Sequence, residues 1–254
     1  MRRHLPFKHF DPKNSVLFYR LLCLCTNYKI ISLRTRIIHF LEQEWPTSVI
    51  SWDQRESHFN TLASLHPPAD AGGIHEGPYL DDLLPEPASI VRLARTHNIP
   101  SILPAALYEL SRTDPNADYM KLHTQPYRQS IPSLQMLSAC VRSALWTALS
   151  NEEHMYIHRG QDAMQRLLLH FFENLPRLCF QPVCIQGRIQ LRAQIWSDSI
   201  KRRDVLSALQ SMRDGRYMIA HGVCSKCTLQ TIEAITKIRQ VIFQSLGHLF
   251  GVTG

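Results

Sequence analysis

Apolar positions recur along most of the chain at the three- and four-residue spacing of an amphipathic helix. This pattern predicts helices over residues 15–25, 30–44, 132–150, 151–172, 189–209 and 228–249. The last has the clearest stripe, formed by Ile235, Ile238, Ile242, Leu246 and Leu249. Gly251 follows it, where a left-handed cap is common. No segment alternates with the two-residue period of a strand, so the sequence predicts a mostly α fold.

A second helical hairpin is predicted in PASIVRLARTHNIPSILPAALYELSR, residues 87–112. It resembles the hairpin of residues 15–44 at an offset of 69 residues. The matching positions include Leu24 and Leu93, Ile30 and Ile99, Leu33 and Ile102, and Leu41 and Leu110. Repeated hairpins stack side by side and share a core that neither could build alone. We therefore expect helical hairpins stacked into a small bundle, although chance similarity between amphipathic helices would give the same matches.

The stretch from residue 46 to residue 87 has a different composition. It concentrates Pro, Gly, Asp and His and lacks periodicity apart from a short helix expected around residues 52–65. The predicted organisation is an N-terminal helical block at 1–46, a linker or loop with a short helix at 47–88, and a C-terminal helical domain at 89–254.

The composition is that of a folded chain with its charge at one end. Of the 254 residues, 44% are hydrophobic, enough for a sizeable core. The formal net charge of +7 lies in the first 40 residues, where eight basic side chains face one acidic residue, Asp11. Such a basic leader is usually a solvated face or the rim of an interface. Without an RNA-binding aromatic signature or a zinc-finger spacing, it argues against a nucleic-acid partner.

Hydropathy and cysteine usage indicate the compartment. No stretch approaches the ~20 apolar residues of a membrane helix, so we expect no membrane partner. Seven cysteines without a secretory signal favour reduced thiols. We expect a cytoplasmic or nuclear protein.

Four cysteines form the most specific candidate site. Cys179 and Cys184 lie in LCFQPVC, and Cys224 and Cys227 lie in HGVCSKC close to His221. Zinc prefers four soft ligands in a tetrahedron, and two close pairs supply them at a small entropic cost. The sequence therefore indicates one structural zinc as the only cofactor. Four unrelated thiols packed as small hydrophobic side chains are the main alternative. A redox Cys-x-x-Cys is a further one, disfavoured because no βαβ pattern surrounds it.

The sequence gives no positive case for an enzyme or a small-molecule substrate. It lacks a nucleophile elbow, a phosphate-binding loop and a kinase motif set, so no catalytic residue is predicted. The pair His154 and His158 shares a helix face but suits a solvated helix start better than a metal site. A linker group of His66, His75, Glu76, Asp81 and Asp82 has no metal-site spacing.

The chain also resembles a known family. LCTNYKIISLRTRIIHFLEQEWPTSVISWDQRE, IVRLARTHNIPSILPAALYEL and VCSKCTLQ…VIFQSLGHLFG are similar to the end of, and the helical region after, the BTB/POZ domain of basidiomycete fungal proteins. The strands of the BTB core have no counterpart here, which suggests a truncated form. The resemblance implies a protein-interaction role.

We accordingly expect a non-catalytic protein–protein interaction module, the C-terminal helical half of a BTB-like protein, with a protein partner. An apolar stripe of Val16, Leu17, Leu21 and Leu24 is expected to be exposed in it. The alternative is a zinc-containing, nucleic-acid-associated regulator that uses the basic N-terminal block.

Overall fold

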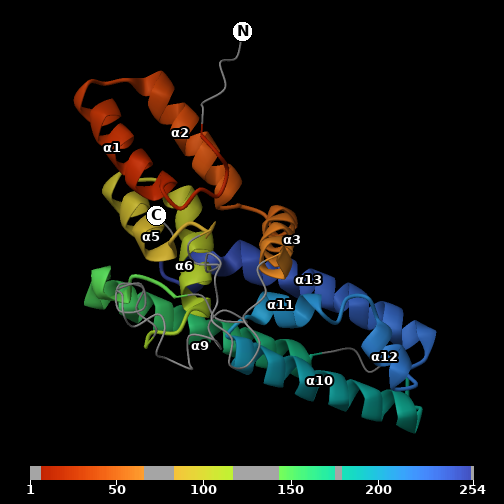
Figure 1. The fold of residues 1–254 in the computed structure, drawn as a ribbon. Coiled ribbons are helices and arrows are strands. Elements are labelled where there is room, and N and C mark those ends of the chain that lie inside the picture. The colour runs from red at the N-terminus through yellow and green to blue at the C-terminus, as the bar shows by residue number, and fades with distance from the viewer. Residues whose placement is uncertain (1–6, 66–82, 117–142, 175–178, 253–254) are drawn as a thin grey trace, which may run out of the picture. The chain divides into compact units, whose positions relative to one another are not determined.

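The computed structural model describes residues 7–65, 83–116, 143–174 and 179–252, and the regular elements among them are all helical (Figure 1). The prediction of a mostly α fold is confirmed for these residues. The chain forms two compact units, one of residues 1–157 with 252–254 and one of residues 158–251. The boundaries expected from the sequence, after residues 46 and 88, both fall inside the first unit.

Two helical hairpins pack together in the first unit. The first consists of α1 (Asn14–Asn27) and α2 (Ile31–Glu44), and the second of α5 (Pro87–Thr96), η1 (Pro100–Ile102) and α6 (Leu103–Arg112). Contacts join α1 to α5 and α2 to η1. The remaining elements are α3 (Val49–Leu65), the short turn η3 (Trp146–Ala148) and the beginning of α9. Residues of α6 are buried on almost every side, so this helix forms the centre of the unit.

The two hairpins turn in the same way. Lys29 and Asn98 both take the left-handed backbone conformation, with φ of 54° and 50°. The next residue then donates its N–H back into the first helix, from Ile30 to the Cys25 carbonyl and from Ile99 to the Ala94 carbonyl. These are the bonds of a Schellman cap, which ends a helix and reverses the chain. The turns lie at equivalent positions of the predicted repeat, which itself stays a prediction.

The helix predicted over residues 132–150 is wrong in its described part. Residues 132–142 lie outside the described residues, and only the single turn η3 follows them. The Leu145 N–H donates to the Glu86 carboxylate at 2.9 Å instead of to a helical carbonyl. Glu86 also caps the start of α5 by accepting from the N–H groups of Ala88 and Ser89. Trp146, in this turn, is buried.

A buried arginine on α3 organises the centre of the first unit. The Arg55 side chain is 1% exposed, and its guanidinium carbon lies 4.2–4.9 Å from the ring centres of Trp45, Trp52 and Phe59. Its Nη1 donates to the Glu109 carboxylate at 3.0 Å. Aromatic faces and the carboxylates of Glu109 and Glu56 thus replace the water that a charged guanidinium loses on burial. The helix expected around residues 52–65 is confirmed, and its buried face belongs to the core.

A second arginine completes this network. Arg112 donates to both oxygens of Glu56, at 2.9 and 2.7 Å, and to Glu109 at 2.9 Å. The two carboxylates and two guanidinium groups therefore balance in charge between α3 and α6. Bidentate pairing of this kind fixes geometry as well as charge.

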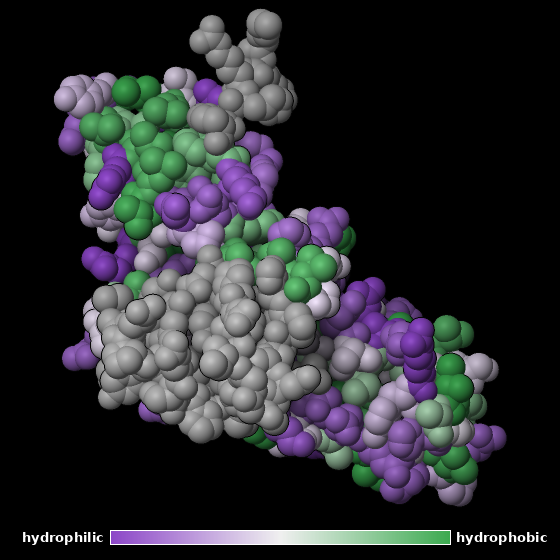
Figure 2. Space-filling view, viewed as in Figure 1, coloured by the Kyte–Doolittle hydropathy of each residue, from purple (hydrophilic) through white to green (hydrophobic). Residues whose placement is uncertain are grey.

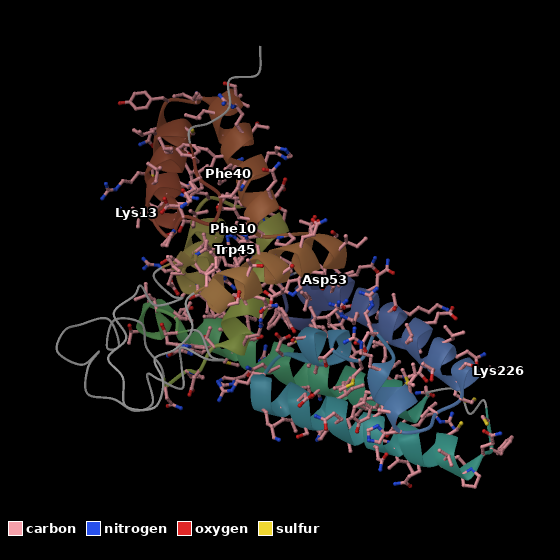
Figure 3. All side chains as sticks on the ribbon, turned by 45° about the vertical axis from the view of Figure 1, so that its right-hand side comes forward. Phe10, Lys13, Phe40, Trp45, Asp53 and Lys226 are labelled. Carbon is pink, nitrogen blue, oxygen red and sulfur yellow. The ribbon has the colours of Figure 1, made fainter. Side chains whose placement is uncertain are left out.

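Glu44, at the end of α2, is a further buried carboxyl group of this unit. Its Oε1 accepts hydrogen bonds from the Phe10 N–H and the Asn14 side chain, and the chain before α1 lies over Trp45 beside it (Figure 3). Burial raises the pKa of Glu44 to about 7, against the lowering effect of these hydrogen bonds and of Arg55. The carboxyl is therefore neutral in the folded protein at mildly acidic pH.

The second unit holds most of α9 (Asn151–Glu173), followed by α10 (Pro182–Arg202), α11 (Val205–Gln210), α12 (Arg216–Ala220) and α13 (Ser225–Leu249). The helix predicted at 151–172 is confirmed. The single helix predicted at 189–209 is two helices, because α10 begins earlier and ends at Arg202, and Arg203 after it has a φ of 52°. Asp204 then caps the separate helix α11 by accepting from the Ser207 N–H.

The predicted stripe of α13 forms part of the core of the second unit. Ile235, Ile238, Ile242 and Leu246 are buried, and Leu249 is half-buried at the end. Gly251 has a φ of 67°, as expected of a left-handed cap. Gly160 on α9 leaves room for the Phe250 ring, since an added Cβ would lie 2.1 Å from it. The aromatic ring and α9 are thereby held in close contact.

Replacing Arg55 tests the buried network. Arg55→Met removes the buried guanidinium that pairs with Glu109, and we expect it to lower the free energy of unfolding by about 3 kcal/mol. The double variant Arg55→Met/Glu109→Gln should recover part of this loss. Urea denaturation of Arg55→Met, Glu109→Gln and the double variant, each compared with the natural chain, measures the coupling energy between Arg55 and Glu109. Arg166→Met, at an exposed ion pair, is the control and should change stability by less than about 0.5 kcal/mol. Equal effects at the two arginines would contradict the assignment.

Glu44 gives the fold a pH dependence of defined sign. Its pKa is higher in the folded chain than in the unfolded chain, so its stabilising effect is complete below pH 4.5 and is lost as the pH rises through 7. We expect Glu44→Gln to be more stable than the natural chain at pH 8, by at most about 3 kcal/mol, and the difference to shrink at pH 5. Denaturant unfolding at both pH values measures it, with Glu42→Gln as the control on the same helix.

Candidate metal centre

Both cysteine pairs lie where helices of the second unit begin. Cys224 is the N-cap residue of α13 and Cys227 lies in its first turn. Cys184 lies in the first turn of α10, and Cys179 precedes that helix. Pro182 at the first position of α10 favours a helix start there, because proline lacks the N–H that would be unpaired. Lys226, between the two cysteines of α13, marks this end of the unit in Figure 3.

The four sulfur atoms converge. Their Sγ atoms all lie within 4.8 Å of one another, and all four cysteines are free thiols. Sulfur ligands around a tetrahedral zinc with Zn–S bonds of about 2.3 Å are roughly 3.8 Å apart. The observed cluster is therefore only slightly wider than a metal-bound one, and small side-chain rotations close it. The structure thus brings together the four ligands that the sequence predicts.

Two glycines allow the second cysteine pair to approach α10. Gly222 takes a φ of 71° in the turn before Cys224. Gly187 faces Val223, and a Cβ added to it would lie 2.3 Å from the valine Cγ2. The close approach lets the Cys224 N–H donate to the Cys184 sulfur at 3.3 Å. On the other side, Arg188 donates to the Cys179 carbonyl at 3.3 Å and holds that residue next to α10.

The thiols have divergent acidities because they share one site. The Cys227 N–H and side chain, followed by Cys184, lower the pKa of Cys224 to about 7 by donating to its sulfur. Burial first, and then the neighbouring thiolates, raise the pKa of Cys227 to about 12. The pKa of Cys184 is also raised. The Cys224 N–H lowers it, but burial together with the hydrogen bonds and charge of the neighbouring cysteines outweighs that effect.

These acidities show what the cluster can do chemically. One thiolate forms readily, but further negative charge in the same half-buried space is opposed by repulsion. The N-termini of α10 and α13 each supply about half a positive charge, which is too little for four thiolates. A divalent cation supplies the missing charge and deprotonates its thiol ligands outright. The cluster is thus suited to hold a soft divalent metal.

The other residues considered from the sequence do not join this site. His221 stacks on Tyr217 with ring centres 4.2 Å apart, and its Nδ1 lies 2.7 Å from the Tyr217 carbonyl. His154, in the first unit, stacks on Trp146. Glu153 caps the start of α9 by accepting from the N–H of Ser150. The linker group at residues 66–82 lies outside the described residues.

The supporting residues were missed by sequence reasoning. Gly187 sits within a helical pattern, where a glycine weakens the prediction but reveals no partner. The signal that could have pointed to its role is its position in a helical pattern three residues after Cys184. An isolated glycine in a helix can have a packing reason, such as the close approach of another segment. Arg188 carries no such signal, since a helical arginine is usually solvated.

No family model, curated protein or solved structure matches this chain. Within the described part of the chain, no helix combines the length and the apolar character needed to cross a membrane.

Proposed function

We propose that Cys179, Cys184, Cys224 and Cys227 bind one structural zinc ion and that the chain is a non-catalytic protein–protein interaction module. The observation that carries the metal assignment is the convergence of four sulfurs from two segments 40 residues apart. An all-thiolate tetrahedron suits zinc, whereas hard cations such as magnesium require oxygen ligands.

The ligand set supports a structural role for the metal. Catalytic zinc keeps one position open for water or substrate and is bound by three protein ligands. Here four cysteines fill the tetrahedron, and two of them are buried. The metal would instead join the N-termini of α10 and α13. Reduced thiols are needed for this, in keeping with a cytoplasmic or nuclear location.

The interaction role has two supports in the first unit. Several large apolar side chains of α1 and of the turn after it are exposed although the hairpin core beneath them is well packed. The segment of residues 90–110, whose sequence resembles BTB-like proteins, forms most of α5 and α6. This is the hairpin on which α1 packs. We propose that the chain corresponds to the helical half of a BTB-like protein. Its exposed apolar side chains would form a surface that binds another protein.

Metal analysis tests the zinc assignment. The purified chain should contain one zinc per molecule, and Cys184→Ser should reduce this to well below one. Removing the metal with a chelator should lower the unfolding temperature, because the metal binds the folded state. Cys23→Ser is the matched control, since Cys23 is half-buried in the first unit and outside the cluster. A folded natural chain with little zinc would contradict the assignment.

Site-specific cross-linking tests the interaction role. The zinc-loaded chain carries a photoreactive amino acid at one of two exposed positions. These are position 28 on the first unit and position 229 on the second. After irradiation in an extract of cells that express the chain, we expect a saturable protein adduct from at least one position, competed by unlabelled chain.

Nuclease treatment of the extract separates this role from its alternative. An adduct that survives treatment indicates a protein partner. An adduct lost with it, together with salt-sensitive binding of DNA or RNA by the purified chain, would favour a nucleic-acid-associated regulator that uses the basic N-terminal residues. No adduct from either position would overturn the interaction role.

A further inference from the structure

The outward face of α1 carries a continuous apolar stripe. Leu17, Leu21, Leu24 and Tyr28 follow one another at spacings of four, three and four residues, which places them on one side of the helix. Leu24 is 46% exposed and Tyr28 is 73% exposed, while Val16 beside the stripe is 56% exposed. The exposure expected for this face is confirmed, with Leu21 half-buried. Figure 2 shows apolar surface over α1 and α2 with hydrophilic residues between the apolar ones.

The turn after α1 extends the apolar surface. Ile31 is 75% exposed and Ile30 is 40% exposed. The left-handed conformation of Lys29 is what brings these residues next to Tyr28 at the tip of the hairpin. The opposite side of α1 is occupied, since Phe18 and Leu22 are fully buried in the core. One side of the helix thus builds the fold and the other is available.

The charge on this face has one sign. Residues 12–41 contain five basic side chains and no acidic one. Lys13 is exposed at the start of the stripe, Arg20 lies between Leu17 and Leu24, and Lys29 lies at its end. Figure 3 shows Lys13 at the outer side of α1. An occupant therefore has to offer apolar side chains in a narrow row and carboxylates beside them.

We propose that the α1 stripe, defined as Leu17, Leu21, Leu24 and Tyr28 with Lys13, Arg20 and Lys29, binds an acidic amphipathic helix of a protein partner. This proposal rests on the interaction role proposed above. A stripe with alternating spacings of three and four residues is the seam into which another helix packs. The 14 residues of α1 extend over about 21 Å, so the partner helix needs roughly four turns.

The position of Arg20 argues against a membrane as the occupant. Helices that lie in a membrane surface keep a wide apolar face and place their charges on the opposite face. Arg20 instead lies beside the stripe, three residues after Leu17 and four before Leu24, where a glutamate or aspartate of a docked helix can reach it. Steering by complementary charge also favours such a partner over a neutral one.

Peptide binding to the full zinc-loaded chain tests the proposal. The probes are three synthetic 18-residue peptides: a helix with leucines on one face and glutamates flanking them, the same helix with lysines in place of the glutamates, and a scrambled acidic peptide. Fluorescence anisotropy measures their affinity. We expect the acidic helix to bind at least tenfold more tightly than the other two and to weaken with salt.

Matched variants locate the binding. Leu17→Ser/Leu24→Ser should weaken the acidic helix by at least tenfold, since the stripe loses its central contacts. Ile219→Ser/Leu229→Ser removes comparably exposed apolar side chains from the second unit and should leave binding unchanged. Circular dichroism and zinc content must match the natural chain in both. If the first variant does not fold, Arg20→Glu serves as a second variant and should reduce the preference for the acidic helix over the lysine peptide.

Each other outcome overturns the proposal. These are equal binding of acidic and basic helices, loss of binding in the second-unit variant, or no binding by a folded chain. Tighter association with vesicles of phosphatidylserine and phosphatidylcholine than with the acidic helix would assign the stripe to a membrane. A protein adduct from position 229 alone would refute the α1 stripe while leaving the interaction role intact, whereas the absence of any adduct would refute both.

Discussion

The second unit depends on a single electrostatic constraint, which is that four thiol groups share one small space at the starts of two helices. Neither helix dipole nor hydrogen bonding can neutralise four thiolates, so the pKa values of Cys224 and Cys227 are driven apart, to about 7 and about 12. A divalent cation, as proposed above, would remove the conflict and would at the same time join the starts of α10 and α13. The segment between Cys184 and Cys224 contains most of α10 and all of α11 and α12. Closing this 40-residue loop restricts the unfolded chain in the way a cross-link does.

The first unit is stabilised by apolar packing and by paired charges within the chain. Its helices surround α6 with a continuous apolar core, and its buried charges are balanced within the chain by the pairing of Arg55 and Arg112 with Glu56 and Glu109. Three aromatic rings around Arg55 make this burial tolerable, because their faces attract a cation that is no longer hydrated. A structure of this kind needs no metal. If the cysteine cluster binds the proposed metal, chelation should affect only the second unit.

Sequence reasoning found what depends on local periodicity and missed what depends on distant partners. The buried stripe of α13 and the cap at Gly251 follow from helical spacing, and the two cysteine pairs were recognisable because each is local. The break at Arg203 was not predictable, since an arginine rarely takes a positive φ and only the packing of α11 explains it. Leu145 leaves a helical pattern because Glu86, 59 residues away, binds its N–H. Arg55 is invisible as a core residue until its aromatic neighbours are known.

The exposed hairpin of α1 and α2 raises the question of why its apolar side chains do not cause self-association. Five positive charges and no negative one lie between residues 12 and 41. Two copies that met through the α1 stripe would bring the three basic residues of each, Lys13, Arg20 and Lys29, together around a small apolar contact, and repulsion would oppose the gain from burial. The same charges attract a partner that carries carboxylates. An apolar surface that is protected from its own copies but not from an acidic helix selects its partner by charge and binds it by apolar burial, so that specificity and affinity come from different residues of one helix.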